Sequence, residues 1–195
     1  VAENIDSGQI YTFRPNEIKK GLKLLQDASV LIGHNIIDYD IRAIKKLYPK
    51  WDTKAYLYDT LIAAKLAYPD VKEMDFKIYN KIIKTPASMR TELDKKKMRC
   101  IGRHSLEAYG LRMNEHKGDF GKDVGFDTFS EAMLEYCIQD VAVNAKLYHR
   151  LVQKELDKDI LHTEIEAQKI CLEQTTFGFD FDIDKAIKLK EELEG

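Results

Sequence analysis

Two aspartates that follow a short apolar segment are the first residues of this sequence that could perform chemistry. Asp38 and Asp40 come directly after the segment Leu31–Asn35, whose apolar beginning and glycine are typical of a strand buried on both faces. In an α/β sheet, ligands gather where strands end and helices begin. We therefore expect acidic groups with a role in binding or catalysis at this junction.

A tyrosine and an aspartate four residues apart form the second candidate. Tyr136 and Asp140 fall on one face of a predicted helix, with Cβ atoms about 5 to 6 Å apart. A helical carboxylate is most often a solvated surface group, and a tyrosine at this spacing is most often at the edge of a core. Apolar residues surround Asp140 in the sequence, and burying the carboxylate unpaired would cost too much free energy. Asp140 must therefore face a cleft, a metal or a partner.

The elements that would position these residues alternate between strand and helix. The apolar spacing and the turn signals predict six of them in order: a strand at 9–13, a helix from the N-cap Asn16 through Ile18, Leu22 and Leu25, a strand at 29–33, a helix at 40–48, a strand at 55–58 and a helix at 61–66. Strands alternating with helices predict an α/β sheet.

The segment 68–103 is less regular and contains Pro69 and Pro86. Within it, the run Lys95–Arg99 has two interpretations. A charge run is usually a solvated loop or helix face, and the alternative is a patch that contacts phosphate groups.

Two capping boxes predict the helices that follow. Thr128 with Glu131 begins a long helix to about Leu156, and Thr163 with Glu166 begins another that ends near Phe177 and Gly178. The buried stripe of the long helix is expected to contain Phe129, Met133, Cys137, Val141, Leu147 and Leu151.

The composition excludes several classes of protein. The 195 residues include 31 Lys+Arg and 33 Asp+Glu, a net charge of −2, and 44% are hydrophobic, which is enough to form a core and excludes wholesale disorder. No apolar run approaches the length of a membrane span. The three cysteines are Cys100, Cys137 and Cys171. Their odd number and wide spacing fit neither a disulfide framework nor a zinc site, so we expect a protein of the reducing cytoplasm. Because the net charge is near neutral, any contact with nucleic acid must come from a local patch of positive charge.

Several motifs in one order resemble a known family. Gly33–Asp40 is similar to the second motif of DEDD exonucleases, and Tyr136–Asp140 is similar to the Y-x-x-x-D of their tyrosine branch. Further similar segments are Tyr58–Leu61, Gly102–Gly110, Lys117–Phe120 and Glu173–Asp182. Together they resemble the 3′→5′ proofreading exonuclease domain of family A DNA polymerases, most closely those of short-tailed bacteriophages.

The resemblance implies a ribonuclease H-like exonuclease fold, with a mixed central sheet flanked by helices. Residues 1–157 would be the exonuclease domain, and residues 158–195 would open a DNA polymerase domain. The family's first motif, a D-x-E on the opening strand, has no counterpart between Val1 and Thr12. Two explanations stay open, truncation of the first strand and genuine loss of the motif. In either case we expect the 195 residues alone to be inactive.

The resemblance also implies a mechanism, hydrolysis of the 3′-terminal phosphodiester by two divalent ions, Mg²⁺ or Mn²⁺. On this match Asp40 and Asp140 would hold metal, and Tyr136 would orient the attacking water. The implied contacts with substrate are Asn35, Tyr39, Tyr109 and Lys117. A packing role at a helix end is equally compatible with Tyr109.

The implied partners are the single-stranded 3′ end of DNA, the polymerase domain of the same full-length chain and a thioredoxin-like processivity factor of the full enzyme, with no membrane. Two alternative functions remain. One is an exoribonuclease like RNase D, and the other is a non-catalytic module that positions DNA.

Overall fold

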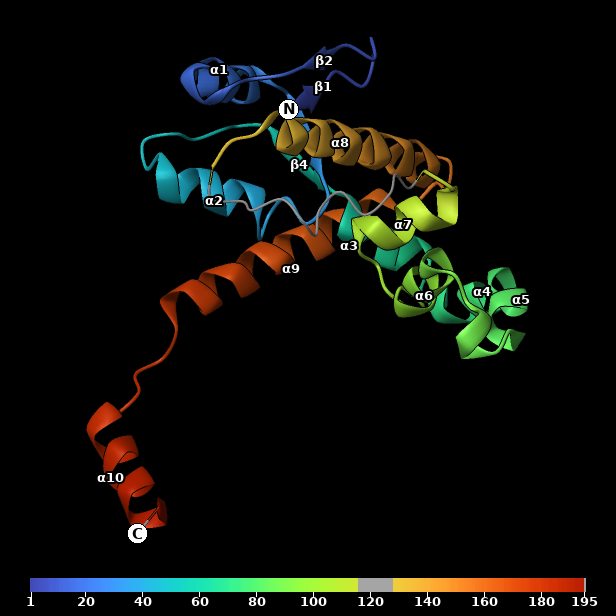
Figure 1. Cartoon of the computed structure of the whole chain (residues 1–195). Helices are drawn as coiled ribbons and strands as arrows, with labels where there is room; N and C mark the ends of the chain where they lie inside the picture. Colours follow the sequence, from blue (N-terminus) through green and yellow to red (C-terminus); the bar gives the residue numbers. More distant parts are fainter. Residues whose placement is uncertain (116–127, 195) are drawn as a thin grey trace.

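The computed structural model describes residues 1–115 and 128–194 (Figure 1). In chain order the elements are β1 (Ala2–Glu3), β2 (Ile10–Tyr11), η1 (Pro15–Glu17), α1 (Ile18–Asp27), β3 (Val30–Gly33), α2 (Asp40–Leu47), β4 (Tyr56–Asp59), α3 (Thr60–Ala67), α4 (Val71–Ile78), α5 (Asn80–Lys84), η2 (Ala87–Met89), α6 (Glu92–Arg99), α7 (Leu106–Met113), α8 (Glu131–Val152), α9 (Lys158–Phe177) and α10 (Ile183–Glu194).

The architecture is mixed α/β and mostly helical, so the predicted α/β class is confirmed at this coarse level. Within the described residues the strands form two pairs: β1 runs antiparallel to β2, and β3 runs parallel to β4 from Val30 opposite Tyr56 to Gly33 opposite Asp59. The expected single central sheet is therefore absent from the described part of the chain. The ribonuclease H-like fold stays a prediction.

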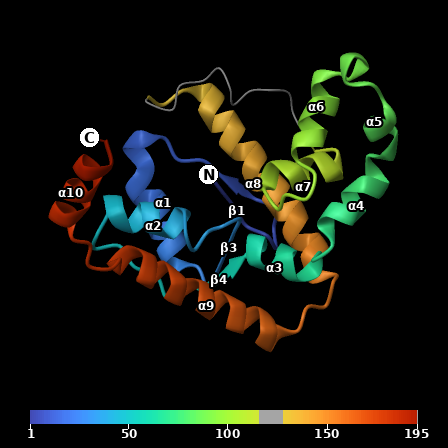
Figure 2. The same cartoon turned by 90° about the horizontal axis from the view of Figure 1, so that it is seen from below.

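The main core surrounds the parallel pair β3–β4. Leu31 and Ile37 from the β3 region pack with residues of α3, α8 and α9, which lie around the pair in Figures 1 and 2. Ala63 and Ala64 of α3 are completely buried, because their small side chains let this helix approach its neighbours closely. Each large side chain in such a core contributes about 1.5 to 3 kcal/mol through removal of apolar surface from water. The core therefore fixes the end of β3 relative to α8.

Most of the regular first part of the sequence prediction is confirmed, although the strand predicted at 9–13 is only the two-residue β2. β3, β4, α2 and α3 occur where the strand and helix patterns place them. The predicted Asn16 cap is wrong, because Asn16 lies inside η1 and α1 begins without a side-chain cap. Segment 68–103, interpreted as irregular, instead forms α4, α5, η2 and α6, and the run Lys95–Arg99 belongs to α6.

The predicted long helix is confirmed as α8, but it begins at a different residue and its row of buried side chains is shorter than predicted. Ser130 caps it by accepting a hydrogen bond from the Met133 amide, so the predicted box at Thr128 is wrong. All buried residues of α8 lie in its second half, which is the half that carries Leu147 and Leu151. Phe129 and Cys137 are exposed, contrary to the predicted stripe.

Helix α9 begins before the predicted capping box. Asp157 accepts hydrogen bonds from the amides of Asp159 and Ile160, whereas Thr163 lies inside the helix and donates to the Asp159 carbonyl. The helix ends at Gly178, whose φ of 71° confirms the predicted glycine stop. The division into two domains at 157/158 stays a prediction.

Within residues 1–115 and 128–194, no helix is long and apolar enough to cross a membrane.

Candidate functional site

The chain reverses sharply where β3 ends. Asn35 has a φ of 61°, in the left-handed region that few residues other than glycine adopt. A Cβ atom on Gly33 would lie 2.7 Å from the Cβ of Ile36. Only glycine therefore fits at position 33, and the close approach directs the chain from β3 toward α2.

A buried aspartate holds this reversal in place. Asp59, at the end of β4, is only 1% exposed. Its carboxylate accepts hydrogen bonds from the amides of Asn35 at 3.0 Å and Ile37 at 3.4 Å, and it caps α3 through the Leu61 amide at 2.9 Å. Asp59 was not among the predicted site residues, although an aspartate between a strand and a helix is a recognisable N-cap signal.

Asp40 is the first residue of α2, on the chain that leaves this reversal. The residue as a whole is exposed, but protein atoms around its carboxyl group exclude enough water to raise the pKa from 3.8 to about 6, and the negative charge of Asp59 acts in the same direction. Asp38 differs, because its partly exposed carboxylate pairs with Arg42 at 3.5 Å. Of the two aspartates predicted at this junction, Asp40 has the environment typical of a functional acid.

On α8, Tyr136 and Asp140 interact directly. A side-chain hydrogen bond joins them, and burial raises the pKa of both groups. The charge of Asp140 raises the pKa of Tyr136 further. A tyrosine held in this way stays protonated and able to donate a hydrogen bond at neutral pH.

A hydrogen-bond network attaches α8 to the end of β3. The Thr60 hydroxyl lies 2.7 Å from the Asn144 Oδ1 and 3.3 Å from the Gly33 carbonyl. The Asn144 amide also donates to the Ile32 carbonyl at 3.5 Å. Because Asn144 follows Asp140 by one helical turn, the two residues share a face of α8.

His34 extends this network to α7. Its Nε2 donates to the His104 carbonyl at 2.9 Å, and its Nδ1 lies 3.0 Å from the Thr60 hydroxyl. Burial lowers the pKa of His34, so the ring is neutral in the folded protein at neutral pH.

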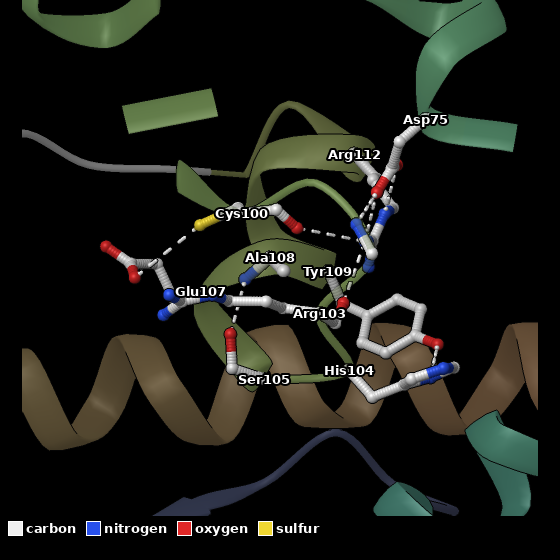
Figure 3. Close-up of polar contacts among 10 residues, drawn as sticks. Asp75, Cys100, Arg103, His104, Ser105, Glu107, Ala108, Tyr109 and Arg112 are labelled. Atoms are coloured by element: carbon white, nitrogen blue, oxygen red, sulfur yellow. Dashed lines mark hydrogen bonds and ion pairs between the residues drawn. The ribbon is translucent and has the colours of Figure 1, made fainter. Parts of the chain in front are cut away.

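The four predicted substrate contacts have different environments. Tyr39 is 69% exposed beside Asp40, and Asn35 is partly buried. Tyr109 is only 3% exposed: its hydroxyl bonds to the His104 Nδ1 at 2.8 Å, and the Arg112 guanidinium lies 4.8 Å from its ring centroid (Figure 3). Of the two interpretations of Tyr109, this placement favours packing over contact with substrate, because the buried ring has no open face on which a base could stack. Lys117 lies outside the described residues.

The donors at the site are chemically suited to a hard divalent cation, because Asp40 and Asp140 offer carboxylate oxygens in partly desolvated positions. Among the residues that the structure describes, no group of three His, Cys, Asp or Glu side chains is placed to hold a metal. Two carboxylates alone would therefore bind such a cation weakly.

Comparisons with known proteins relate the chain to phage replication enzymes. No family model matches it. It is 25% identical over 184 residues to the DNA-directed DNA polymerase of Enterobacteria phage T3, covering 82% of this chain and 24% of the polymerase. It is 24% identical over 191 residues to that of Escherichia phage T7, covering 85% and 25%. The chain thus spans about a quarter of the length of the curated relatives it matches.

Proposed function

We propose that this region, distantly related to phage DNA-directed DNA polymerases, is a 3′→5′ exonuclease part that removes nucleotides from the end of a DNA strand. The similarity to the phage polymerases extends over most of the chain. The motifs around Asp40 and Asp140 occur in the order that this family of exonucleases uses. The partners proposed with this function are a single-stranded DNA end and the polymerase part of such an enzyme.

The observation that carries the proposal is the link between α8 and β3. Asn144 bonds to the end of β3, and the Asp59 carboxylate holds the chain that runs from β3 to Asp40. The face of α8 that carries Asp140 is thereby attached to the strand end from which Asp40 follows. This arrangement supports a shared role for the two carboxylates.

In the proposed reaction, Asp40 and Asp140 would hold the divalent ions, which supply charge neutralisation and an activated water when bound. Tyr136 would accept a hydrogen bond from the attacking water while its hydroxyl proton stays on the Asp140 carboxylate. The exposed ring of Tyr39 would support the terminal base. Each of these roles uses a group whose position is fixed by α2 or α8.

The test is a single-turnover assay on 3′-labelled single-stranded DNA with Mg²⁺, carried out with the complete gene product. We expect stepwise shortening from the 3′ end, loss of nearly all cleavage in Asp140→Asn, and a smaller decrease in Tyr136→Phe. Asp38→Asn is the matched control, because its carboxylate forms only a partly exposed ion pair. Cleavage by Asp140→Asn at the wild-type rate would refute the proposal.

One observation favours a second candidate, a non-catalytic module that positions DNA. The described residues provide no group of three possible metal ligands. This candidate predicts DNA binding without shortening in the same assay. Adding a labelled RNA strand as competitor distinguishes DNA from RNA as the substrate.

A further inference from the structure

Positive charge is concentrated in one helical lobe of the chain. We use the term basic lobe for residues 71–103, which contain α4, α5, η2 and α6. The lobe has ten Lys+Arg and four Asp+Glu, a net charge of +6, whereas the other residues have 21 Lys+Arg and 29 Asp+Glu, a net charge of −8. In Figures 1 and 2 its helices extend from one end of the molecule. A chain that is nearly neutral overall therefore has a strongly polarised charge distribution.

Two of the four acidic groups of the lobe, Asp75 and Asp94, are held by specific partners. Asp75 is completely buried and forms a bidentate ion pair with Arg112 of α7, at 2.7 and 2.6 Å (Figure 3). Asp94 closes a capping box with Thr91 at the start of α6. These carboxylates therefore do little to cancel the positive charge at the surface of the lobe.

Several cations of the lobe face solvent without an acidic partner among the described residues. Lys77, Lys81, Lys84 and Arg99 are exposed. No acidic side chain of the described residues lies within ion-pair distance of these four. Unpaired exposed cations on neighbouring short helices form a local positive field, which attracts a polyanion even when the whole chain is slightly acidic.

Apolar surface lies among these cations. Phe76 of α4 is 44% exposed, and the Lys72 ammonium lies 5.9 Å from its ring centroid. Ile78 and Met89 are 52% and 74% exposed. Surfaces that bind single-stranded nucleic acid combine cations for the backbone with an exposed aromatic ring on which a base stacks. A duplex, whose bases are already stacked, gains nothing from the Phe76 ring.

We propose that the basic lobe is a binding surface for single-stranded DNA, with Lys77, Lys81, Lys84 and Arg99 on phosphates and Phe76 under a base. The residues of this surface belong to α4, α5 and α6, whereas Asp40 belongs to α2 and Asp140 to α8. The choice of DNA rests on the proposed function, whereas the choice of a single-stranded polyanion rests on the charge and the exposed ring.

The experiment is fluorescence anisotropy with a labelled 16-nucleotide single strand, in EDTA and over a range of salt concentrations. The lobe variant combines Lys77→Gln, Lys81→Gln, Lys84→Gln and Arg99→Gln. Its matched control combines four substitutions of exposed lysines outside the lobe, namely Lys19→Gln, Lys46→Gln, Lys158→Gln and Lys188→Gln. Circular dichroism establishes that both variants are folded.

We expect the lobe variant to bind at least tenfold more weakly, and its salt slope to fall by about 0.7 for each phosphate contact removed. The control should bind nearly as the wild type does. Phe76→Ala should weaken single-strand binding by about tenfold and duplex binding much less. Equal losses in the lobe variant and the control, or tighter binding of duplex than of single strand, would overturn the proposal. EDTA removes metal-dependent cleavage, so a failure of the exonuclease proposal would leave this result interpretable.

Discussion

Two buried polar networks hold this molecule together in different ways. At the end of β3, Asp59 accepts hydrogen bonds from three backbone amides and forms no ion pair with any side chain that the structure describes. At the base of the basic lobe, Asp75 is neutralised by Arg112, which also donates to the Arg103 carbonyl at 2.7 Å. The first network shapes a backbone reversal next to Asp40. The second anchors a charged lobe to α7, so its loss affects stability rather than the shape of the candidate site.

The largest expected effect is at the ion pair. Arg112→Met leaves the Asp75 carboxylate buried without its cation, and should lower the free energy of unfolding by about 3 to 5 kcal/mol, measured by urea denaturation. The double variant Asp75→Leu with Arg112→Met removes both charges and is the control. It should recover a large part of the loss, and an equal loss in both variants would contradict the ion-pair explanation.

Asp59→Ala should have the next largest effect. The substitution removes the cap of α3 and leaves amides of the β3 reversal without an acceptor, which should cost about 2 to 3 kcal/mol in urea denaturation. Asp157→Ala removes the exposed cap of α9 and is the matched control, with an expected cost of about 1 kcal/mol. Similar costs for the two would show that Asp59 acts only as a cap.

The pH dependence of the free energy of unfolding is a further test of the network at the end of β3, because this network contains His34. Because burial lowers the pKa of His34, the imidazole of His34 binds a proton more readily in the unfolded chain than in the folded chain. The contribution of His34 to the free energy of unfolding is complete above about pH 6.5. It decreases as the pH falls through the lower pKa that His34 has in the folded protein. Asp40, with a raised pKa of about 6, acts in the opposite direction over the same range.

His34→Gln isolates the histidine from that opposing effect. The difference in unfolding free energy between wild type and variant should shrink as the pH is lowered from 7 to 5, in urea titrations at each pH. A difference that stays constant would show that His34 does not titrate in this network.

The smallest effect is expected at Tyr79, a buried residue of the basic lobe. The buried hydroxyl of Tyr79 and the Nη1 of Arg112 have no hydrogen-bond partner among the residues that the structure describes. Tyr79→Phe removes a hydroxyl that gains no bond, so it should be neutral or stabilising by up to about 1 kcal/mol in thermal unfolding. Tyr58→Phe is a comparison at a tyrosine that is only partly buried. A clear destabilisation by Tyr79→Phe would indicate that the hydroxyl has a partner such as a buried water.

The strongly patterned elements were predictable from the sequence. β3, β4, α2 and α3 follow from apolar runs and turn signals, because each buries a face whose spacing is visible locally. The helices of the basic lobe were missed, since short charged helices bury little and show weak periodicity. The capping box of Thr91 and Asp94 was the available signal. Helix starts were misplaced where a nearer serine or aspartate, Ser130 or Asp157, provides the cap.

The candidate site was predictable only in part. Asp40 was selected from its place after a strand and Tyr136 and Asp140 from their helical spacing; the roles that the motif resemblance implies for them are still predictions. The contributions of Asp59 and Asn144 to the site depend on contacts between residues 22 to 112 positions apart in the sequence. No local pattern reports such contacts. Likewise, the burial of Tyr109 on α7 depends in part on the rings of His34 and Tyr68, which are distant from it in the sequence.

The tight reversal at Gly33 limits how this protein can vary. The Cβ of Ile36 occupies the space that any side chain at position 33 would need, and it is attached directly to the backbone and cannot rotate away. At Gly110, by contrast, an added methyl group would meet its nearest neighbour at an ordinary 3.6 Å. A library randomised at both codons and selected for folding should return glycine almost alone at position 33 and a mixture with alanine at position 110.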